Sequence, residues 1–272
     1  MALGNNGPGW LFCPADRPER FAKAAAAADV VILDLEDGVA AKDRDAARKA
    51  LIDTPLDPTK TVVRVNPVTT PDHALDVEAL KATEYTTVML AKTETAEQVA
   101  SLAPLDVVVL IETPLAALVV AELARVENAF AVMWGAEDLF AVLGGTANRW
   151  ADGSYRDVAK HVRSQSLLAA KAYGKMALDS VYLDIKDLAG LAAETDDAVA
   201  VGFDAKVAIH PTQVAVIRAS YAPTEEQVTW ARHVLDAARS ERGVFQFEGI
   251  MVDAPVLRRA ERIVQLAPHP GS

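Results

Sequence analysis

Acidic side chains follow several hydrophobic runs of the sequence, at the points where those runs end. Glu36 and Asp37 come after the second run, Glu112 directly after the fifth and Asp138 shortly after the sixth. Magnesium prefers near-octahedral oxygen ligation, binds one or two carboxylates and keeps positions for water and substrate. We therefore predict Glu112 and Asp138 as direct metal ligands, with Glu36 and Asp37 binding metal-bound water or orienting the ligands. For any one acid taken singly, capping of the next helix is the alternative role.

Hydrogen-bond donors lie within or after other runs of the same kind. Arg64 lies in the third run, and its planar fork of donors can hold a carboxylate in bidentate fashion, although a nearby acid could also satisfy it. Backbone N–H groups at Gly135 and Ala136 could bind the same carboxylate or an oxyanion. Lys92 could form a Schiff base, but a lysine in such a position more often pairs with an acid. The sequence therefore favours metal chemistry over imine chemistry.

Three basic residues lie close together near the start of the chain. Arg17, Arg20 and Lys23 fall within seven positions of an otherwise acidic protein. They could bind phosphate groups as forks and point charges. They could equally form a solvated face of a helix, and the residues themselves favour neither alternative.

Charge and cysteine content restrict the class of protein. The formal net charge of −11 repels nucleic acid and anionic lipid, so we expect neither as a partner. The single cysteine, Cys13, allows no internal disulfide and fits a reducing compartment. No basic-plus-apolar targeting segment is visible, and acidic residues interrupt the most apolar stretch, Val107–Leu123. We expect a cytoplasmic protein that does not enter a membrane.

Short hydrophobic runs alternate with alanine-rich helical patterns along most of the chain. Continuous apolar runs indicate strands buried on both faces, and strand–helix alternation indicates a parallel sheet. The usual nucleotide-binding glycine motifs are absent and polar residues end nearly every run, so a TIM (β/α)8 barrel is favoured over an open α/β sheet. The predicted strands are Trp10–Cys13, Val30–Leu35, Thr61–Val65, Thr87–Leu90, Val107–Ile111, Ala131–Trp134, Ser180–Leu183 and Lys206–Ile209.

The last section departs from this alternation, so we predict a barrel over residues 1–222 and a tail over residues 223–272. Thr224 is the predicted N-cap of the first tail helix. A tail that does not complete the barrel can pack on a neighbouring subunit, which leads us to expect an oligomer. The tail is predicted to contain a long helix over 224–242, an extended segment over 244–255 and a final helix up to about residue 266.

Six short motifs in the chain fall in a recognisable order and at fitting intervals. They are Phe12–Ala24, Val31–Val39, Arg64–Asn66, Gly135–Leu139, Ile209–Gln213 and Gly249–Pro255. Together they resemble the HpcH/HpaI aldolase and citrate lyase family, specifically its citrate lyase beta subunit-like branch. The closest likeness is to the stand-alone mycobacterial citrate lyase beta-like proteins, and the resemblance covers nearly the whole chain.

This resemblance implies a TIM barrel, usually a homotrimer, with Mg²⁺ (or Mn²⁺) held by Glu112 and Asp138. It implies that Arg64 binds the carboxylate of a 2-oxo acid. It also implies that Asp253 reaches into a neighbouring subunit's site, where it acts as acid and base on an acetyl methyl group. The residues that it places near the phosphates of coenzyme A (CoA) are Arg17, Arg20 and Lys23.

The implied reaction is reversible, Mg²⁺-dependent cleavage of a 3-hydroxyacyl-CoA to acetyl-CoA and a 2-oxo acid. Citramalyl-CoA, malyl-CoA and citryl-CoA are the candidate substrates, with pyruvate, glyoxylate or oxaloacetate as the second product. The alternatives are a CoA-independent class II aldolase and a citrate lyase-type subunit that needs partner proteins. Two departures from the family pattern, Pro114 to Ala116 after Glu112 and Ala91 before Lys92, leave the shape of the acyl group open.

Overall fold

The structure, a computed structural model, describes residues 3–241 and 243–267. It divides into two compact units, Met1–Ile217 and Arg218–Ser272. Each unit has its own hydrophobic core. Among the residues that the structure describes, no helix is long and apolar enough to cross a membrane.

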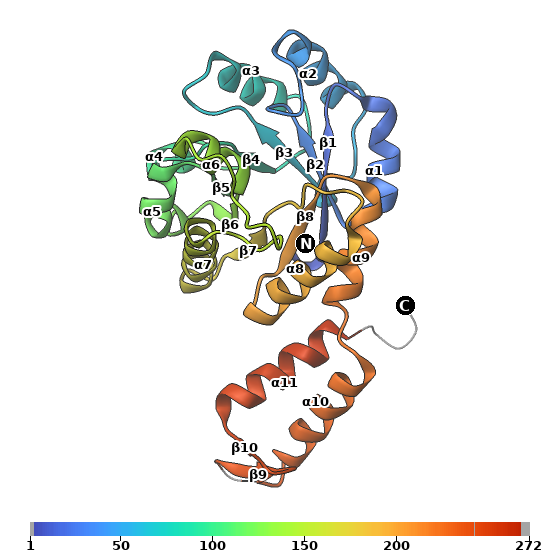
Figure 1. Cartoon of the computed structure of the whole chain (residues 1–272). Coiled ribbons are helices and arrows are strands. Elements are labelled where there is room, and N and C mark those ends of the chain that lie inside the picture. The colour runs from blue at the N-terminus through green and yellow to red at the C-terminus, as the bar shows by residue number, and fades with distance from the viewer. Residues whose placement is uncertain (1–2, 242, 268–272) are drawn as a thin grey trace. The chain divides into compact units, whose positions relative to one another are not determined.

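Eight parallel strands in the first unit form a closed barrel (Figure 1), which confirms the predicted (β/α)8 architecture. Each strand pairs with the next along the chain, and β8 pairs with β1 to close the ring. The carboxyl ends of all eight strands therefore meet at one face, where barrel enzymes place their sites. The strands are β1 (Gly9–Pro14), β2 (Val30–Asp34), β3 (Thr61–Val65), β4 (Thr87–Leu90), β5 (Asp106–Ile111), β6 (Ala129–Trp134), β7 (Met176–Asp179) and β8 (Ala205–Ala208).

Helices connect the strands and surround the barrel (Figure 1). The connection from β6 to β7 contains two helices, joined by a loop over residues 144–156. The α-helices are α1 (Phe21–Ala27), α2 (Arg44–Asp53), α3 (Pro71–Leu80), α4 (Ala96–Ala100), α5 (Pro114–Ala124), α6 (Ala136–Leu143), α7 (Asp157–Ala172), α8 (Leu188–Val201) and α9 (Pro211–Tyr221). Short 3-10 helices are η1 (Leu3–Asn5), η2 (Pro18–Arg20), η3 (Ala41–Asp43) and η4 (Pro58–Lys60).

Side chains from alternate strand positions fill the interior of the barrel. One buried cluster includes Trp10, Ile32 and Leu178 together with Ala205 and Val207 of β8. Successive side chains of a strand point to opposite faces, so the residues between these point outward, toward the helices. A charged residue can therefore lie in the middle of a barrel strand without entering the barrel core.

The seventh strand is the one whose predicted position is wrong. The prediction was Ser180–Leu183, whereas β7 is Met176–Asp179 and residues 180–183 belong to the loop after it. The strand has to begin directly after the turn at Gly174, whose φ of 66° ends the preceding helix. Met176-Ala-Leu has no β-branched residue, so strand propensity favoured the next four residues instead.

Beyond the end of α9, the described residues of the second unit form two helices and a two-stranded antiparallel sheet. Its elements are α10 (Glu225–Ala237), β9 (Phe245–Phe247), β10 (Ile250–Val252) and α11 (Ala254–Leu266). Thr224 forms a capping box with Gln227, which confirms it as the N-cap of α10. The predicted first helix was too long, because α10 ends at Ala237; Arg242 lies outside the described residues. The predicted extended segment is the β9–β10 hairpin, and the final helix ends at Leu266 as expected.

Candidate active site

Polar residues that lie at the end of β3 or follow β2, β4, β5 and β6 come together at the carboxyl end of the barrel. Contacts join Glu36 and Asp37 after β2, Arg64 of β3 and Lys92 after β4. Lys92 in turn contacts Glu112 after β5 and Asp138 of α6. The structure therefore assembles the predicted metal ligands, their predicted neighbours and Arg64 in a single cluster.

Arg64 forms a bidentate ion pair with Asp34, an acid to which the sequence analysis gave no role. Nε donates to Asp34 Oδ1 at 2.7 Å and Nη2 donates to Oδ2 at 2.6 Å. Nη1 lies 3.3 Å from Glu36 Oε2, and the guanidinium carbon lies 4.6 Å from the centre of the Phe12 ring. Burial opposes the charge, but Asp34 and Glu36 outweigh it and raise the pKa of Arg64. The edge between Nη1 and Nη2 keeps donors for a substrate carboxylate, while the Nε edge is occupied.

The sequence around Asp34 explains how this pair is held. The Asp34 carboxylate also accepts the backbone N–H groups of Glu36 at 2.9 Å and Gly38 at 2.8 Å. A Cβ atom at position 38 would lie 2.3 Å from Asp34 Oδ2, which is shorter than any real contact. Glycine at position 38 therefore lets the loop fold back onto the carboxylate that orients Arg64.

Of the two acids predicted to bind metal, Glu112 is more buried than Asp138, with 2% of its surface exposed. Its Oε1 accepts the backbone N–H of Lys92 at 2.8 Å. Burial and the nearby Asp138 carboxylate raise the pKa of Glu112 to about 8, against the lowering effect of Lys92. Thr113 caps α5 through the N–H of Ala116, and Pro114 takes the first helical position, where its missing N–H costs the helix nothing.

The turn between β6 and α6 brings Asp138 toward Glu112. Gly135 allows the close approach, because a Cβ atom there would lie 3.1 Å from Glu112 Oε2. The Gly135 N–H donates to the Ile111 carbonyl at 2.8 Å, and the use of the Gly135 and Ala136 N–H groups as substrate donors stays a prediction. Ala136 is the first residue of α6, so its N–H is one of the amides that the start of a helix leaves without an intrahelical acceptor.

The chemistry of this donor set fits a single hard divalent cation. Among the described residues, no group of three or more potential ligands is already arranged around a metal position. Two carboxylates, one after β5 and one in α6, nevertheless suffice for magnesium, whose remaining ligands are water and substrate. Burial and the Asp138 carboxylate both raise the pKa of Glu112, and a cation between the two acids would offset both effects.

We expect metal binding to release a proton below about pH 8. The Glu112 carboxyl has its pKa raised from 4.5 to about 8, so it is protonated at neutral pH and must ionise to bind a cation. The apparent affinity for Mn²⁺ should therefore rise about tenfold per pH unit up to that value and then level off. Titration calorimetry in buffers of different ionisation enthalpy measures the released proton directly. An affinity for Mn²⁺ that does not change between about pH 6 and 8 would contradict the coupling of metal binding to ionisation of Glu112.

The basic residues near the start of the chain are separated by the structure. Arg20 and Lys23 line a cavity of about 350 Å³, together with Phe12, Cys13 and His210 among others. Phe12 therefore contacts this cavity and also packs against the Arg64 guanidinium. Arg17 is not among the residues lining the cavity and instead lies 3.7 Å from Asp16.

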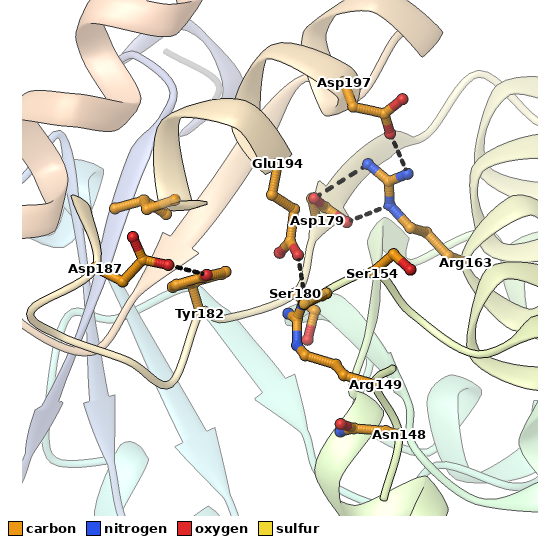
Figure 2. A network of polar contacts seen from close by, with 12 residues as sticks. Asn148, Arg149, Ser154, Arg163, Asp179, Ser180, Tyr182, Asp187, Glu194 and Asp197 are labelled. Carbon is orange, nitrogen blue, oxygen red and sulfur yellow. Dashed lines mark hydrogen bonds and ion pairs between the residues drawn. The ribbon is translucent and has the colours of Figure 1, made fainter. Parts of the chain in front are cut away.

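A second polar network, not predicted from the sequence, lies outside the barrel between β7, β8 and their helices (Figure 2). Lys206 of β8 is fully buried, and its Nζ donates to Asp179 Oδ2 and Glu194 Oε1, both at 2.9 Å. Arg163 of α7 donates to Asp179 Oδ1 at 2.9 Å, and Arg149 of the 144–156 loop donates to Glu194 Oε2 at 2.6 Å. Opposite charges therefore alternate through the network and no buried charge lacks a partner.

The network fixes the loop that follows α6. Although burial opposes it, Lys206 and Arg163 lower the pKa of Asp179 to about 2. The Arg149 guanidinium lies over the Tyr155 ring at 3.7 Å, and Asn148 in the same loop donates to Glu137 beside Asp138 at 2.6 Å. A lysine within the apolar run Lys206–Ile209 was the one signal of this network in the sequence.

Comparisons with known proteins agree with this geometry. The model of the HpcH/HpaI aldolase/citrate lyase family matches residues 9–211. The chain is 62% identical to the citrate lyase subunit beta-like protein of Mycobacterium tuberculosis H37Rv, over 98% of both chains. It is 31% identical to the mitochondrial citramalyl-CoA lyase of Homo sapiens, over 94% of this chain and 84% of the relative.

A solved structure is similar over nearly the same length. The crystal structure of the CitE protein of M. tuberculosis in complex with magnesium, acetoacetate and coenzyme A superposes with a TM-score of 0.94 at 62% identity, covering 97% of this chain and 99% of that one. A family match over residues 9–211 includes every strand of the barrel and the whole acidic cluster. The chain belongs to the HpcH/HpaI aldolase/citrate lyase family.

Proposed function

We propose that this protein is a Mg²⁺-dependent carbon–carbon lyase that cleaves a 3-hydroxyacyl-CoA to acetyl-CoA and a 2-oxo acid. The observation that carries the proposal is that Glu112 and Asp138 both contact Lys92 at the carboxyl end of the barrel, in the same cluster as the partly occupied fork of Arg64. The similarity to citramalyl-CoA lyase and to a protein that binds magnesium, acetoacetate and coenzyme A supports the same reaction class. The chain is thus a carbon–carbon lyase, and we propose which acyl groups it cleaves and which residues take part in the reaction.

The substrate test is an assay of the purified protein against citramalyl-CoA, malyl-CoA and citryl-CoA. Release of acetyl-CoA is followed with Mg²⁺ and after chelation. Metal-dependent cleavage of one thioester supports the proposal and identifies the 2-oxo acid. If folded, metal-supplemented protein cleaves none of them, the function moves to a CoA-independent aldolase or to a subunit that needs partner proteins.

The residues of the cluster have separate tasks in this reaction. A magnesium ion bound by Glu112 and Asp138 would supply Lewis-acid chemistry, holding the 2-hydroxy carboxylate and making its hydroxyl more acidic. Arg64 binds the substrate carboxylate through its Nη1–Nη2 edge, while Asp34 holds the guanidinium in place from the other side. Glu36 and Asp37 keep the local charge negative and orient Lys92.

Arg20 and Lys23 are proposed to bind phosphate groups of the CoA moiety, because both line the cavity beside Phe12. Changing both to alanine should raise the KM for the thioester about tenfold or more and leave kcat nearly unchanged. Arg17→Ala removes a basic residue outside this cavity and serves as the control. If the control raises the KM as much as the double variant does, lining the cavity does not distinguish the residues that bind CoA from those that do not.

Asp253 is proposed to act as the acid and base on the acetyl methyl group of a neighbouring subunit, within a homotrimer that the tail over residues 223–272 helps to form. Asp253 caps α11 by accepting the Val256 N–H at 3.3 Å. Asparagine caps helices as well as aspartate, so Asp253→Asn should keep the fold while turnover falls by about a thousandfold. The measurements are kcat and the thermal midpoint of the variant.

Mixing two inactive variants tests whether Asp253 acts in trans. If Asp253 acts on a neighbouring subunit's site, oligomers assembled from Asp253→Asn and Glu112→Gln chains contain some sites with both native residues, and otherwise they contain none. Recovery of activity on mixing supports action between subunits, whereas no recovery in oligomers shown to be mixed contradicts it.

The single Cys13 is a buried thiol, which supports the cytoplasm as the proposed compartment.

A further inference from the structure

Lys92 has an unusual backbone conformation at the centre of the acidic cluster. Its φ angle is 49°, in the left-handed region that a residue with a Cβ atom adopts only against steric strain. Glycine would adopt the same conformation without that strain. The conformation lets the Lys92 N–H donate to Glu112 Oε1 at 2.8 Å while its side chain extends toward other acids. Strain of this kind in a site is a reason to look for a role of the side chain.

The ammonium group of Lys92 contacts three carboxylates at once. Its Nζ lies 2.5 Å from Glu36 Oε1, 3.3 Å from Asp37 Oδ2 and 3.2 Å from Asp138 Oδ1. An ammonium has three hydrogens, so one can be directed to each of these acids. Through its backbone and its side chain together, Lys92 touches both proposed metal ligands and both of their acidic neighbours.

The contacts of Lys92 offset part of the negative charge of the cluster. Two cations, Arg64 and Lys92, face a larger number of acids, and Asp34 already occupies one edge of Arg64. Removal of the Lys92 ammonium would leave three carboxylates around the position that it occupies. Of these three, Glu36 would keep a cationic contact, with Arg64 Nη1 at 3.3 Å. Three carboxylates and water form a suitable site for Mg²⁺ or Mn²⁺. A cation there would share Asp138 with the proposed catalytic metal.

We propose that Lys92 acts as a built-in cation that restricts the acidic cluster to one divalent metal ion and keeps Asp138 available to it. This inference depends on the metal site of the proposed function. Two divalent ions bridged by a carboxylate form a site of different chemistry, in which Asp138 would no longer be held for the first ion alone. Lys92 is thus a specificity-determining residue for metal number, and it forms no covalent bond with substrate.

The test counts Mn²⁺ ions bound to the full-length protein after removal of metal. Lys92→Met keeps a long unbranched side chain and the backbone N–H but removes the charge. Wild-type protein should bind one Mn²⁺ per chain, and the variant two, with an electron paramagnetic resonance spectrum broadened by coupling between neighbouring ions. Once the first site is saturated, a further rise in Mn²⁺ concentration should lower the turnover of the variant by about tenfold or more. The turnover of the wild-type protein should level off instead.

Two controls separate charge from other effects. Lys92→Arg keeps a cation and should bind one ion, whereas Lys49→Met removes an exposed lysine that pairs with Asp53 on α2 and should also bind one. One ion per chain in folded Lys92→Met overturns the inference while leaving the proposed function intact. No metal bound by the wild type contradicts the proposed function itself. If circular dichroism shows Lys92→Met to be unfolded, Lys92→Gln is titrated in its place and judged by the same count.

Discussion

Glu112→Gln is expected to lower the rate of carbon–carbon cleavage by at least about a thousandfold while the barrel stays folded. The amide is a poor ligand for a hard cation, because it carries no charge. Its oxygen can still accept the Lys92 N–H that Glu112 Oε1 accepts at 2.8 Å. Burial of a charged Glu112 is unfavourable, as its raised pKa shows, so the neutral amide should not destabilise the metal-free protein.

The measurements are kcat with saturating Mg²⁺ and the thermal midpoint with and without the metal. Mg²⁺ should raise the midpoint of the wild-type protein but not that of Glu112→Gln, because ligand binding stabilises only a state that binds it. Glu122→Gln, an exposed position on α5, is the control for the same chemical change. A normal Mg²⁺-dependent rate in Glu112→Gln would exclude Glu112 as a metal ligand.

Lys206→Met is expected to lower the free energy of unfolding by about 3–5 kcal/mol, the largest loss of stability from a single substitution that we predict. Lys206 is fully buried and donates to Asp179 and Glu194, both at 2.9 Å. Without the ammonium, these two acids are left with excess negative charge inside the protein. Denaturant-induced unfolding measures the loss.

The matched control is Lys171→Met, which breaks a half-exposed pair with Asp204 and should cost less than about 1 kcal/mol. The network also predicts how the stability of the protein depends on pH in the acid range. Because the pKa of Asp179 is lowered from 3.8 to about 2, its contribution to stability is present above about pH 4 and is lost as the pH falls toward 2. Equal losses of stability in the two lysine variants would show that the network is not the source.

The barrel could be predicted from the sequence because strands buried on both faces leave continuous apolar runs, and seven of the eight runs overlap strands of the structure. The exception is instructive. The position of β7 depends on the turn at Gly174 and on pairing with β6 and β8, such as Ala131 with Met176. Neither constraint is local, so local propensity placed this strand four residues too late.

The acidic cluster was predictable to the same extent and for the same reason. Residues at the ends of parallel barrel strands have to meet, so Glu112 and Asp138 could be grouped without a structure. The partner of Arg64 could not be predicted, because one acid ends β2 and two more follow it closely. Only the register, which pairs Asp34 with Arg64, distinguishes them. The same holds for Asp179 and Lys206, which are paired across β7 and β8.

Closure of the barrel has a consequence for how the chain folds during synthesis. The pairing of Gly9 with Lys206 joins nearly the first and the last strand residues of the ring, so it cannot form until β8 has been made. Until then the growing sheet has two open edges, of β1 and of the newest strand, and open edges can pair with other chains. Non-local pairing of this kind also slows folding. A ribosome pause before β8 should therefore raise the demand for chaperones more than a pause after it.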